Sequence, residues 1–219
     1  MSAPEPATAD VAGETHGGTG PARTTVLGPV LGPDDDVVAA LGERPHRVLV
    51  AGTSGAGKTT LAGRLAALWD LRYTELDGLY HGPGWTPRPQ FLDEVRALVA
   101  SDRWVSEYQY TVARPLLAER AQLLVWLDLP VPVVMHQVVR RTVRRSLRRL
   151  ELWNGNVEPP LWTLLTDDDH ILRWAWQTRR KLADLPERLA REAPHLVVVR
   201  LRSRREVERW VTAQAAQAR

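Results

Sequence analysis

The sequence lacks cysteine, long apolar runs and a large net charge. Without cysteine the chain can form neither disulfide bonds nor a metal site built from thiolates. No stretch approaches a membrane-spanning length of about 18 apolar residues. The N-terminal stretch MSAPEPATADVAGETHGGTGPA has neither the basic start nor the apolar centre of a secretory signal. We therefore expect a cytoplasmic protein without membrane spans.

Large apolar residues are also scarce at the N-terminus. Residues 1–34 are rich in Ala, Pro, Gly and Thr, which predicts a disordered or loosely attached tail. Over the whole chain of 219 residues 44% are hydrophobic, which is enough for the core of one domain over residues 35–219. The net charge is only +3, but the arginines are unevenly placed, which favours a local anion site over a globally basic surface.

Residues 51–60 read AGTSGAGKTT and contain the pattern G-x-x-x-x-G-K-[ST], known as Walker A. The apolar run before them, 46–51, predicts a buried strand, and the leucine spacing after them predicts a helix over about 58–69. Glycines let backbone N–H groups turn around a phosphate chain, and the helix start adds its positive end. The segment therefore predicts an ATP-binding loop made of Gly52, Thr53, Ser54, Gly55, Ala56, Gly57, Lys58, Thr59 and Thr60.

Two side chains of this loop have predicted roles. Lys58 is expected to reach the β and γ phosphates of ATP, and the Thr59 hydroxyl to bind Mg²⁺. The alternative is a glycine-rich turn that binds nothing, but the strand before the loop and the helix after it favour the phosphate-binding interpretation.

The remaining chain alternates between predicted strands and predicted helices. Alternation of this kind indicates an α/β fold, with a parallel sheet covered by helices on both faces and ligands at the carboxyl ends of the strands. The further strands are expected at 72–77, 103–108, 122–130 and 195–201, and the further helices at 89–101, 114–121, 131–150, 170–193 and 203–217.

Three acidic residues end predicted strands, namely Asp77, Glu107 and Asp128. Strand ends of a parallel sheet gather at one edge, so all three are candidates to hold Mg²⁺ or its waters, or to orient and deprotonate an acceptor hydroxyl. The alternative is that such acids only cap the next helix or turn. The sequence favours function for Glu107 and Asp77, and leaves both interpretations open for Asp128.

The predicted helix after the fourth strand carries a stripe of six arginines. Guanidinium groups match phosphate oxygens, and an arginine near the moving phosphoryl group stabilises its charge. Arg141, Arg144 and Arg145 are the candidates for this role. The alternatives are a solvated basic face and a non-specific nucleic-acid patch. The stripe consists of Arg140, Arg141, Arg144, Arg145, Arg148 and Arg149.

Two irregular stretches have predicted roles at the site, one as a contact for a second substrate and one as a mobile cover. Residues 79–90 are long enough to wrap an acceptor, with His81 and Trp85 as possible contacts, and the alternative is a packed Trp85 and an exposed His81. Residues 151–170 follow the arginine helix and suggest a cover over the site, with its tip at 154–156. Tyr108, Gln109 and Tyr110, which come directly after Glu107, could line the same pocket.

With these residues placed, the chain resembles the adenylate-kinase-like branch of P-loop proteins, and within it the kinase-like DNA topology modulation proteins. The resemblance covers about 45–212 and depends on GTSGAGKTTLA, ELDGLYHGPGW, WVSEYQY, LLVWLDLP, ELWNGN with the arginine helix, and RLRSRREVERW. It implies a five-stranded parallel sheet in the order 2-3-1-4-5. It also implies an acceptor region over about 77–101 and a lid over about 140–170.

The same resemblance implies roles for individual residues. Glu107 stands where these kinases have a carboxylate beside the glycine loop, although SEYQY replaces the more usual Asp-Gly-Asn-Tyr. Arg202 and Ser203 would lie near the adenine of ATP.

Together these features predict a small phosphotransferase that uses ATP and Mg²⁺. Lys58, Glu107, Asp77 and the lid arginines would be its catalytic residues, and the acceptor would be a nucleoside, a nucleotide or a similar hydroxyl or phosphate compound. Two alternatives remain, a nucleic-acid-associated ATPase or 5′-kinase, and a non-catalytic ATP-binding regulator. Nucleic acid is the less favoured partner, because the sequence has no interleaving of aromatic and basic residues.

Overall fold

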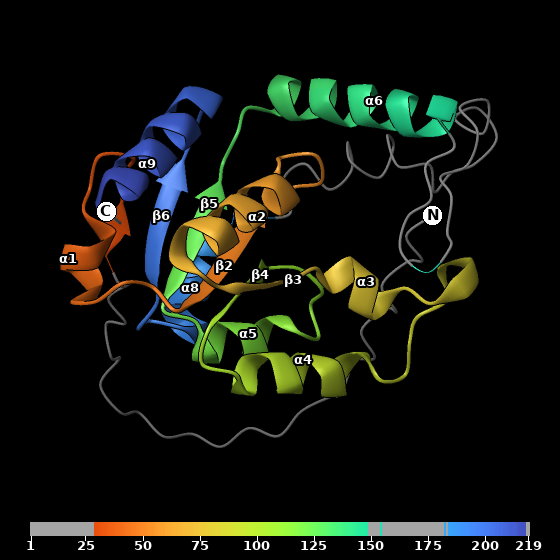
Figure 1. Cartoon of the computed structure of the whole chain (residues 1–219), viewed down its shortest axis with the longest axis horizontal. Helices are drawn as coiled ribbons and strands as arrows, with labels where there is room; N and C mark the ends of the chain where they lie inside the picture. The colour runs from red at the N-terminus through yellow and green to blue at the C-terminus, as the bar shows by residue number, and fades with distance from the viewer. Residues whose placement is uncertain (1–28, 149–153, 155–181, 183, 218–219) are drawn as a thin grey trace, which may run out of the picture.

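The structure is a computed structural model that describes residues 29–148, 154, 182 and 184–217. These residues form a parallel β-sheet with helices on both faces (Figure 1). The strands are β1 (Val30–Leu31), β2 (Arg47–Gly52), β3 (Arg72–Thr74), β4 (Trp104–Glu107), β5 (Leu123–Leu127) and β6 (Val197–Leu201). The helices are α1 (Val37–Leu41), α2 (Lys58–Trp69), α3 (Leu76–Tyr80), α4 (Phe91–Ala100), α5 (Arg114–Arg120), α6 (Val131–Arg148), α8 (Leu185–Glu192) and α9 (Arg204–Gln217), with a 3₁₀ turn η1 (Pro83–Trp85).

The strand order across the sheet is β1-β6-β5-β2-β4-β3. The five strands that the sequence predicts are therefore present in the predicted order, and the α/β class is confirmed. The strand count was wrong, because β1 adds a sixth strand that pairs with β6 through Val30 and Val198. A strand of two residues has no alternation that a sequence pattern could detect. Since β1 lies within 1–34, the chain joins the fold earlier than the predicted tail allows.

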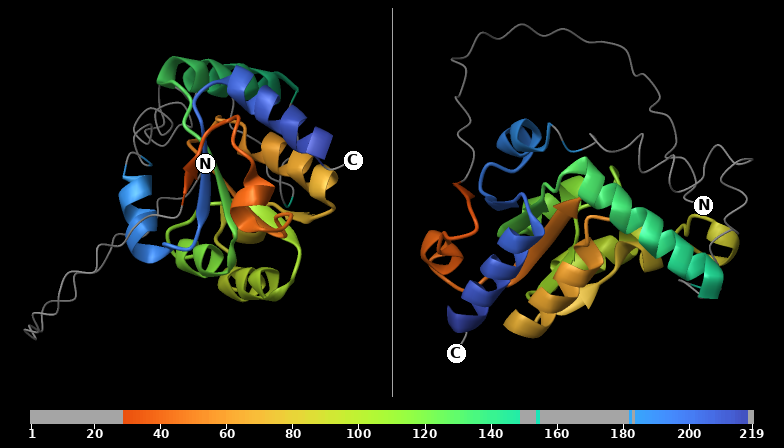
Figure 2. Two further views of the ribbon diagram at one scale, coloured as in Figure 1. Left: turned by 90° about the vertical axis from the view of Figure 1, so that its left-hand side faces the viewer. Right: turned by 90° about the horizontal axis from the view of Figure 1, so that it is seen from above.

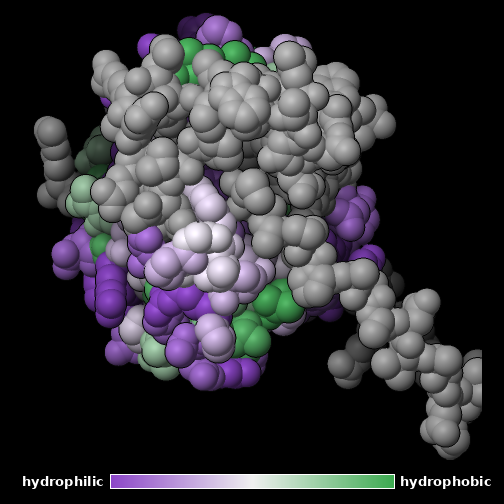
Figure 3. Space-filling model, turned by 90° about the vertical axis from the view of Figure 1, so that its right-hand side faces the viewer, coloured by the Kyte–Doolittle hydropathy of each residue, from purple (hydrophilic) through white to green (hydrophobic). Residues whose placement is uncertain are grey.

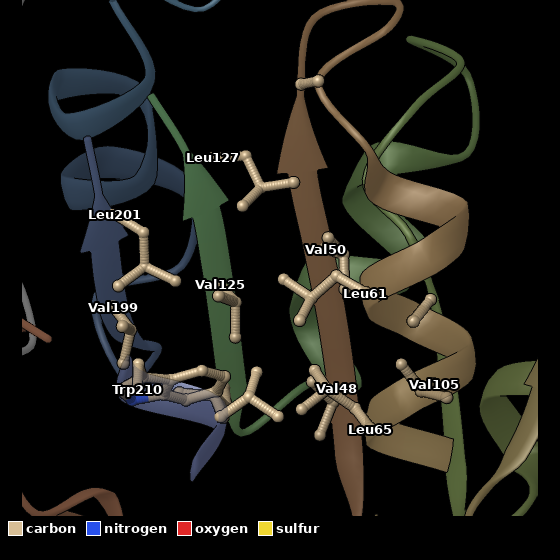
Figure 4. Packing of buried hydrophobic residues seen from close by; sticks show 14 of the residues in the cluster. Val48, Val50, Leu61, Leu65, Val105, Val125, Leu127, Val199, Leu201 and Trp210 are labelled. Atoms are coloured by element: carbon tan, nitrogen blue, oxygen red, sulfur yellow. The ribbon is translucent and has the colours of Figure 1, made fainter. Parts of the chain in front are cut away.

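The two faces of the sheet carry separate apolar clusters. On one face Val48 and Val50 pack with Leu61 of α2 and Trp210 of α9 (Figure 4). On the other face Leu49 and Ala51 pack under α4, α5 and α8. Figure 2 shows the same arrangement, with α2 and α9 on one side of the sheet and α4 and α5 on the other. Because β2 and β5 are buried on both faces, their sequences are almost wholly apolar, as expected for central parallel strands.

Two predicted boundaries change the placement of candidate residues. The strand predicted over 72–77 ends at Thr74, and Asp77 lies in the first turn of α3, so it is not a strand-end residue. Asp128 lies one residue beyond the end of β5. The predicted helix 170–193 falls largely outside the described residues, which show α8 over Leu185–Glu192. Within the described part of the chain, no helix combines the length and the apolar character that a membrane crossing requires.

Candidate functional site

The glycine loop joins the carboxyl end of β2 to the first residue of α2, as the sequence predicts. Gly55 and Gly57 have φ values of 80° and 99°, in the left-handed region that favours glycine. A Cβ atom at Gly55 would lie 2.2 Å from Cγ2 of Val138, whereas a Cβ at Gly57 would meet nothing within 4 Å. Gly55 is therefore required both by backbone shape and by the close approach of α6, and Gly57 by backbone shape alone.

Lys58 begins α2 and points back over the loop. Its Nζ lies 3.5 Å from the carbonyl oxygen of Thr53. Desolvation lowers the pKa of Lys58, while the charges of Glu107 and Asp77 raise it. The ammonium group thus lies between the loop and two carboxylates, where it can bind a phosphate without a long movement.

Glu107 ends β4 with its side chain buried, at 2% exposure. Its Oε1 accepts hydrogen bonds from Thr59 Oγ1 at 2.8 Å and from the Tyr73 hydroxyl at 3.3 Å. Its Oε2 is buried and has no hydrogen-bond partner among the described residues. Burial raises the pKa of Glu107, and the charge of Lys58 lowers it.

These contacts test whether the residues fit a magnesium ion. An unpartnered buried carboxylate oxygen next to a threonine hydroxyl is a donor set that suits Mg²⁺, directly or through its waters. No group of three or more His, Asp or Glu side chains that could hold a metal occurs among the residues described. The remaining ligands would therefore have to come from phosphates and water, which is usual for Mg²⁺ bound with a nucleotide.

Asp77 lies close enough to Lys58 for its charge to raise the pKa of that lysine. Its Oδ1 accepts from Gln109 Nε2 and from the Tyr110 hydroxyl, each at 2.6 Å. The charge of Asp77 raises the pKa of Glu107, so the two carboxylates lie within electrostatic range of each other. The structure thus brings the two favoured acids to one place, although Asp77 arrives there from α3.

Of the predicted arginines, Arg141 is the one whose contact with the loop is described. Its Nη2 lies 3.4 Å from Ser54 Oγ, and its charge lowers the pKa of Lys58. Arg144 is exposed on α6, and the side chain of Arg145 lies outside the described residues. Most of the predicted lid, from residue 149 on, also lies outside them apart from Asn154.

Asp128 and the segment before α9 have structural partners. Asp128 Oδ2 accepts from Arg200 at 2.9 and 2.5 Å, and the guanidinium carbon of Arg200 lies 4.4 Å from the ring centroid of Trp126. Ser203 Oγ accepts from the backbone N–H of Glu206, whose carboxylate accepts from the N–H of Arg202. These bonds cap the start of α9. The two bonds from Arg200 support the structural interpretation of Asp128. The place of Arg202 and Ser203 near adenine stays a prediction.

Two site residues were missed at the sequence level. Tyr73 belongs to β3 and donates to Glu107, and burial together with the charge of Glu107 raises its pKa, so that its hydroxyl stays protonated. Arg114 begins α5, is 7% exposed, lies 5.4 Å from the ring centroid of Tyr108 and lowers the pKa of Lys58. Nothing in the sequence of the predicted strand 72–77 indicated that the Tyr73 side chain would reach the site. The sequence did carry a signal for Arg114. This arginine stands directly before Pro115, at the start of a helix that follows the end of a predicted strand.

Comparisons with known proteins do not assign the chain to a family. No protein-family model matches the sequence, and no curated protein matches it. The chain is similar to a shikimate kinase from Bacteroides thetaiotaomicron at 14% identity and a TM-score of 0.47, over 79% of this chain and 98% of that one. It is similar to a shikimate kinase from Acinetobacter baumannii in complex with shikimate at 16% identity and a TM-score of 0.45, over 80% and 92%.

A third similar structure is a gluconokinase from Sinorhizobium meliloti 1021, at 19% identity and a TM-score of 0.45, over 80% of this chain and 94% of that one. Similarities of this strength carry no argument about activity. The resemblance to DNA topology modulation proteins therefore stays a prediction.

Proposed function

We propose that the chain is a phosphotransferase that moves the γ-phosphoryl group of Mg·ATP to a small acceptor. The observation that supports this most strongly is the bond between Thr59 and Glu107 next to Lys58. It joins the hydroxyl predicted to bind Mg²⁺ to a buried carboxylate that has a second, unpartnered oxygen. A glycine-rich turn without a ligand has no need of this arrangement.

Each residue of the nucleotide half has a role in this proposal. The backbone N–H groups of the loop hold the phosphate chain, and Lys58 binds its β and γ oxygens. Thr59 and Glu107 hold Mg²⁺, which when bound neutralises phosphate charge. Arg141, which approaches the loop from α6, stabilises the charge of the phosphoryl group during transfer. Arg202 and Ser203 are assigned to the adenine end.

The acceptor half is assigned to residues 77–101 together with Gln109 and Tyr110. Asp77 orients the acceptor hydroxyl and takes its proton. Residues 140–170, with Arg144 and Arg145, are assigned to a lid that keeps water from competing as the acceptor.

The test is a screen of Mg·ATP-dependent phosphoryl transfer to nucleosides, nucleotides and small polyols. We expect transfer to at least one of these acceptors. We also expect a loss of roughly 10²–10³-fold in Lys58→Ala, because a positioned cation is removed from developing charge. Arg64→Ala is the matched control on the same helix, since Arg64 forms a surface ion pair with Glu208. Slow hydrolysis with every acceptor, or an unchanged Lys58→Ala, would contradict the proposal.

A further inference from the structure

Backbone strain is concentrated around His81. Among the described residues four that are not glycine have positive φ, and three of these contact His81. The ring of Trp85 lies 5.3 Å from the imidazole, the Tyr110 hydroxyl lies 3.3 Å from Nε2, and the side chain of Asn154 donates to the carbonyl oxygen of His81. Left-handed backbone at bulky residues is costly and persists only where the surroundings hold it, most often at functional sites.

Tyr110 is the member of this group that reaches the proposed site. Its ring stacks on Tyr80 at 4.2 Å and meets Phe91 edge-on at 5.2 Å, so its position is set by packing. Its hydroxyl donates to Asp77 Oδ1. Because a tyrosine has only one hydroxyl proton, the His81 nitrogen beside it must be the donor, in the Nε2–H form. Tyr110 therefore fixes the orientation of the Asp77 carboxylate.

Gln109 fixes the same carboxylate from a second direction. A carboxylate can only accept, so the Gln109 amide must present its N–H group to Asp77, and its own Oε1 points elsewhere. In the described part of the molecule, neither Asp77 Oδ2 nor Gln109 Oε1 forms a hydrogen bond, and neither is a buried atom. Each of these two acceptor oxygens belongs to the same amide or carboxylate group as one end of the 2.6 Å bond between Gln109 Nε2 and Asp77 Oδ1, so the two groups that carry them are adjacent.

We infer that the phosphoryl acceptor presents two hydroxyl groups on neighbouring carbons, one to Asp77 Oδ2 and one to Gln109 Oε1. Such vicinal diols occur in polyols, sugars and the ribose of nucleosides. The inference rests on the proposed function and narrows its acceptor class. The hydroxyl oxygen on Asp77 forms the new bond to the γ-phosphorus, the bond from that phosphorus to the β–γ bridging oxygen breaks, ADP leaves with the electron pair, and the hydroxyl proton passes to Asp77.

A phosphate group fits this place less well as the acceptor. The donors nearest to Asp77, from Gln109 and Tyr110, are already directed at its Oδ1. A phosphate would face the carboxylate with its own negative charge, and Asp77 is close enough to raise the pKa of Glu107. On the side of the molecule where α3 and η1 lie, the described residues that can be seen are mostly hydrophilic or of intermediate hydropathy, with smaller hydrophobic patches (Figure 3).

The first experiment compares matched acceptors in Mg·ATP-dependent transfer. The pairs are adenosine with 2′-deoxyadenosine and 1,2-propanediol with 1-propanol. We expect kcat/KM to fall at least about tenfold when one hydroxyl of the diol is removed, since a hydrogen bond to the site is lost. Equal use of a monohydric alcohol or of 2′-deoxyadenosine 5′-monophosphate would overturn the inference and leave the proposed function standing. If nothing is phosphorylated, the proposed function itself fails.

The second experiment asks whether Gln109 and Tyr110 cause the preference. Gln109→Leu should reduce the diol preference to about threefold or less, because one acceptor oxygen is removed. Tyr110→Phe keeps the ring stack and should raise the KM of the acceptor while leaving the KM of ATP unchanged. Val112→Ala is the control, because Val112 follows Tyr110 closely in the chain but is 57% exposed, and it should keep the full preference. A full preference in Gln109→Leu would overturn the inference.

A spectroscopic readout separates positioning by Tyr110 from a general structural role. In the unmodified chain, ¹⁵N NMR should show His81 as the Nε2–H tautomer, and burial, which lowers the pKa of His81, favours this neutral form. Tyr110→Phe should change the His81 signal, and Val112→Ala should not. A Nδ1–H tautomer in the unmodified chain would contradict the hydrogen-bond chain from His81 to Asp77.

Discussion

On the nucleotide side, which consists of loop residues 52–60 with Glu107, one continuous segment makes most of the site. On the acceptor side, which consists of Asp77, His81, Gln109 and Tyr110, four residues come from two segments separated by β4 and α4. The left-handed positions of the nucleotide side are glycines, which adopt them without strain, whereas the acceptor side uses Tyr110. The nucleotide side is therefore a local motif, and the acceptor side is held in shape by its packing.

The largest expected effect concerns Arg141, which belongs to neither segment. If it stabilises the transferred phosphoryl group, Arg141→Ala should lower kcat by about 10³-fold, because the charge that develops in transfer loses its counter-charge. Arg140→Ala, an exposed arginine on the same helix, should change kcat by less than about twofold. Steady-state kinetics with saturating Mg·ATP measures both. Similar losses in the two variants would indicate a general basic face instead of a directed arginine.

Glu107 belongs to the nucleotide side and also lies within electrostatic range of Asp77 on the acceptor side. Glu107→Gln keeps the shape and an oxygen for Thr59, but it removes the charge near the predicted metal position. We expect turnover to fall about 10- to 100-fold and the Mg²⁺ concentration for half-maximal activity to rise. An unchanged Mg²⁺ dependence would separate Glu107 from the metal and assign it to the acceptor side.

The pH dependence follows from the raised pKa of Glu107. A carboxyl whose pKa lies above its ordinary value of 4.5 takes up its proton at a higher pH than usual as the pH falls. Activity that needs ionised Glu107 should therefore decline on the acid side with a midpoint above 4.5, and a profile of kcat/KM against pH measures this, because kcat/KM reports the groups of the free enzyme. The acid limb should disappear in Glu107→Gln. If it persists unchanged in that variant, another group controls it.

A smaller effect is expected from Gly55→Ala on the nucleotide side. The new Cβ would lie 2.2 Å from Val138, on a backbone with φ of 80°, so we expect about 1–3 kcal/mol of destabilisation and weaker ATP binding. Gly63→Ala is the control within α2, where a Cβ meets nothing within 4 Å. It should stabilise the chain by up to about 1 kcal/mol. Denaturant unfolding and calorimetric titration with ATP measure the pair, and equal stability would contradict the contact with α6.

The smallest effect is expected at the ion pair of Arg200 and Asp128, outside both sides. Each side chain is about one third exposed, so Arg200→Ala should change the free energy of unfolding by no more than about 1 kcal/mol. Turnover should stay within about twofold. A tenfold loss of turnover would place Asp128 in the site after all and would extend the nucleotide side to the end of β5.

Predictions from the sequence were most reliable for structural features that depend on residues close together along the chain. The helix predicted over 58–69 is α2 with the same bounds, because apolar periodicity carries this information. The order of the five predicted strands is also correct, but it came from the resemblance to the adenylate-kinase-like proteins and not from the pattern of residues. The pattern was wrong at 72–77, where the polar residues after Thr74 begin a helix instead of extending β3. It could not detect β1, which is a strand only because β6 offers it an open edge.

By itself, the sequence determined the glycine loop, the lysine and the alternation that builds the sheet, since each depends on residues adjacent along the chain. Only the tertiary structure decided that Tyr73 and Thr59 share one oxygen of Glu107, and that Tyr110 and Gln109 share one oxygen of Asp77. The partners of these bonds lie 32 to 48 positions apart. Hydrogen bonds act over about 3 Å, so they depend on how strands and helices pack and not on spacing along the chain.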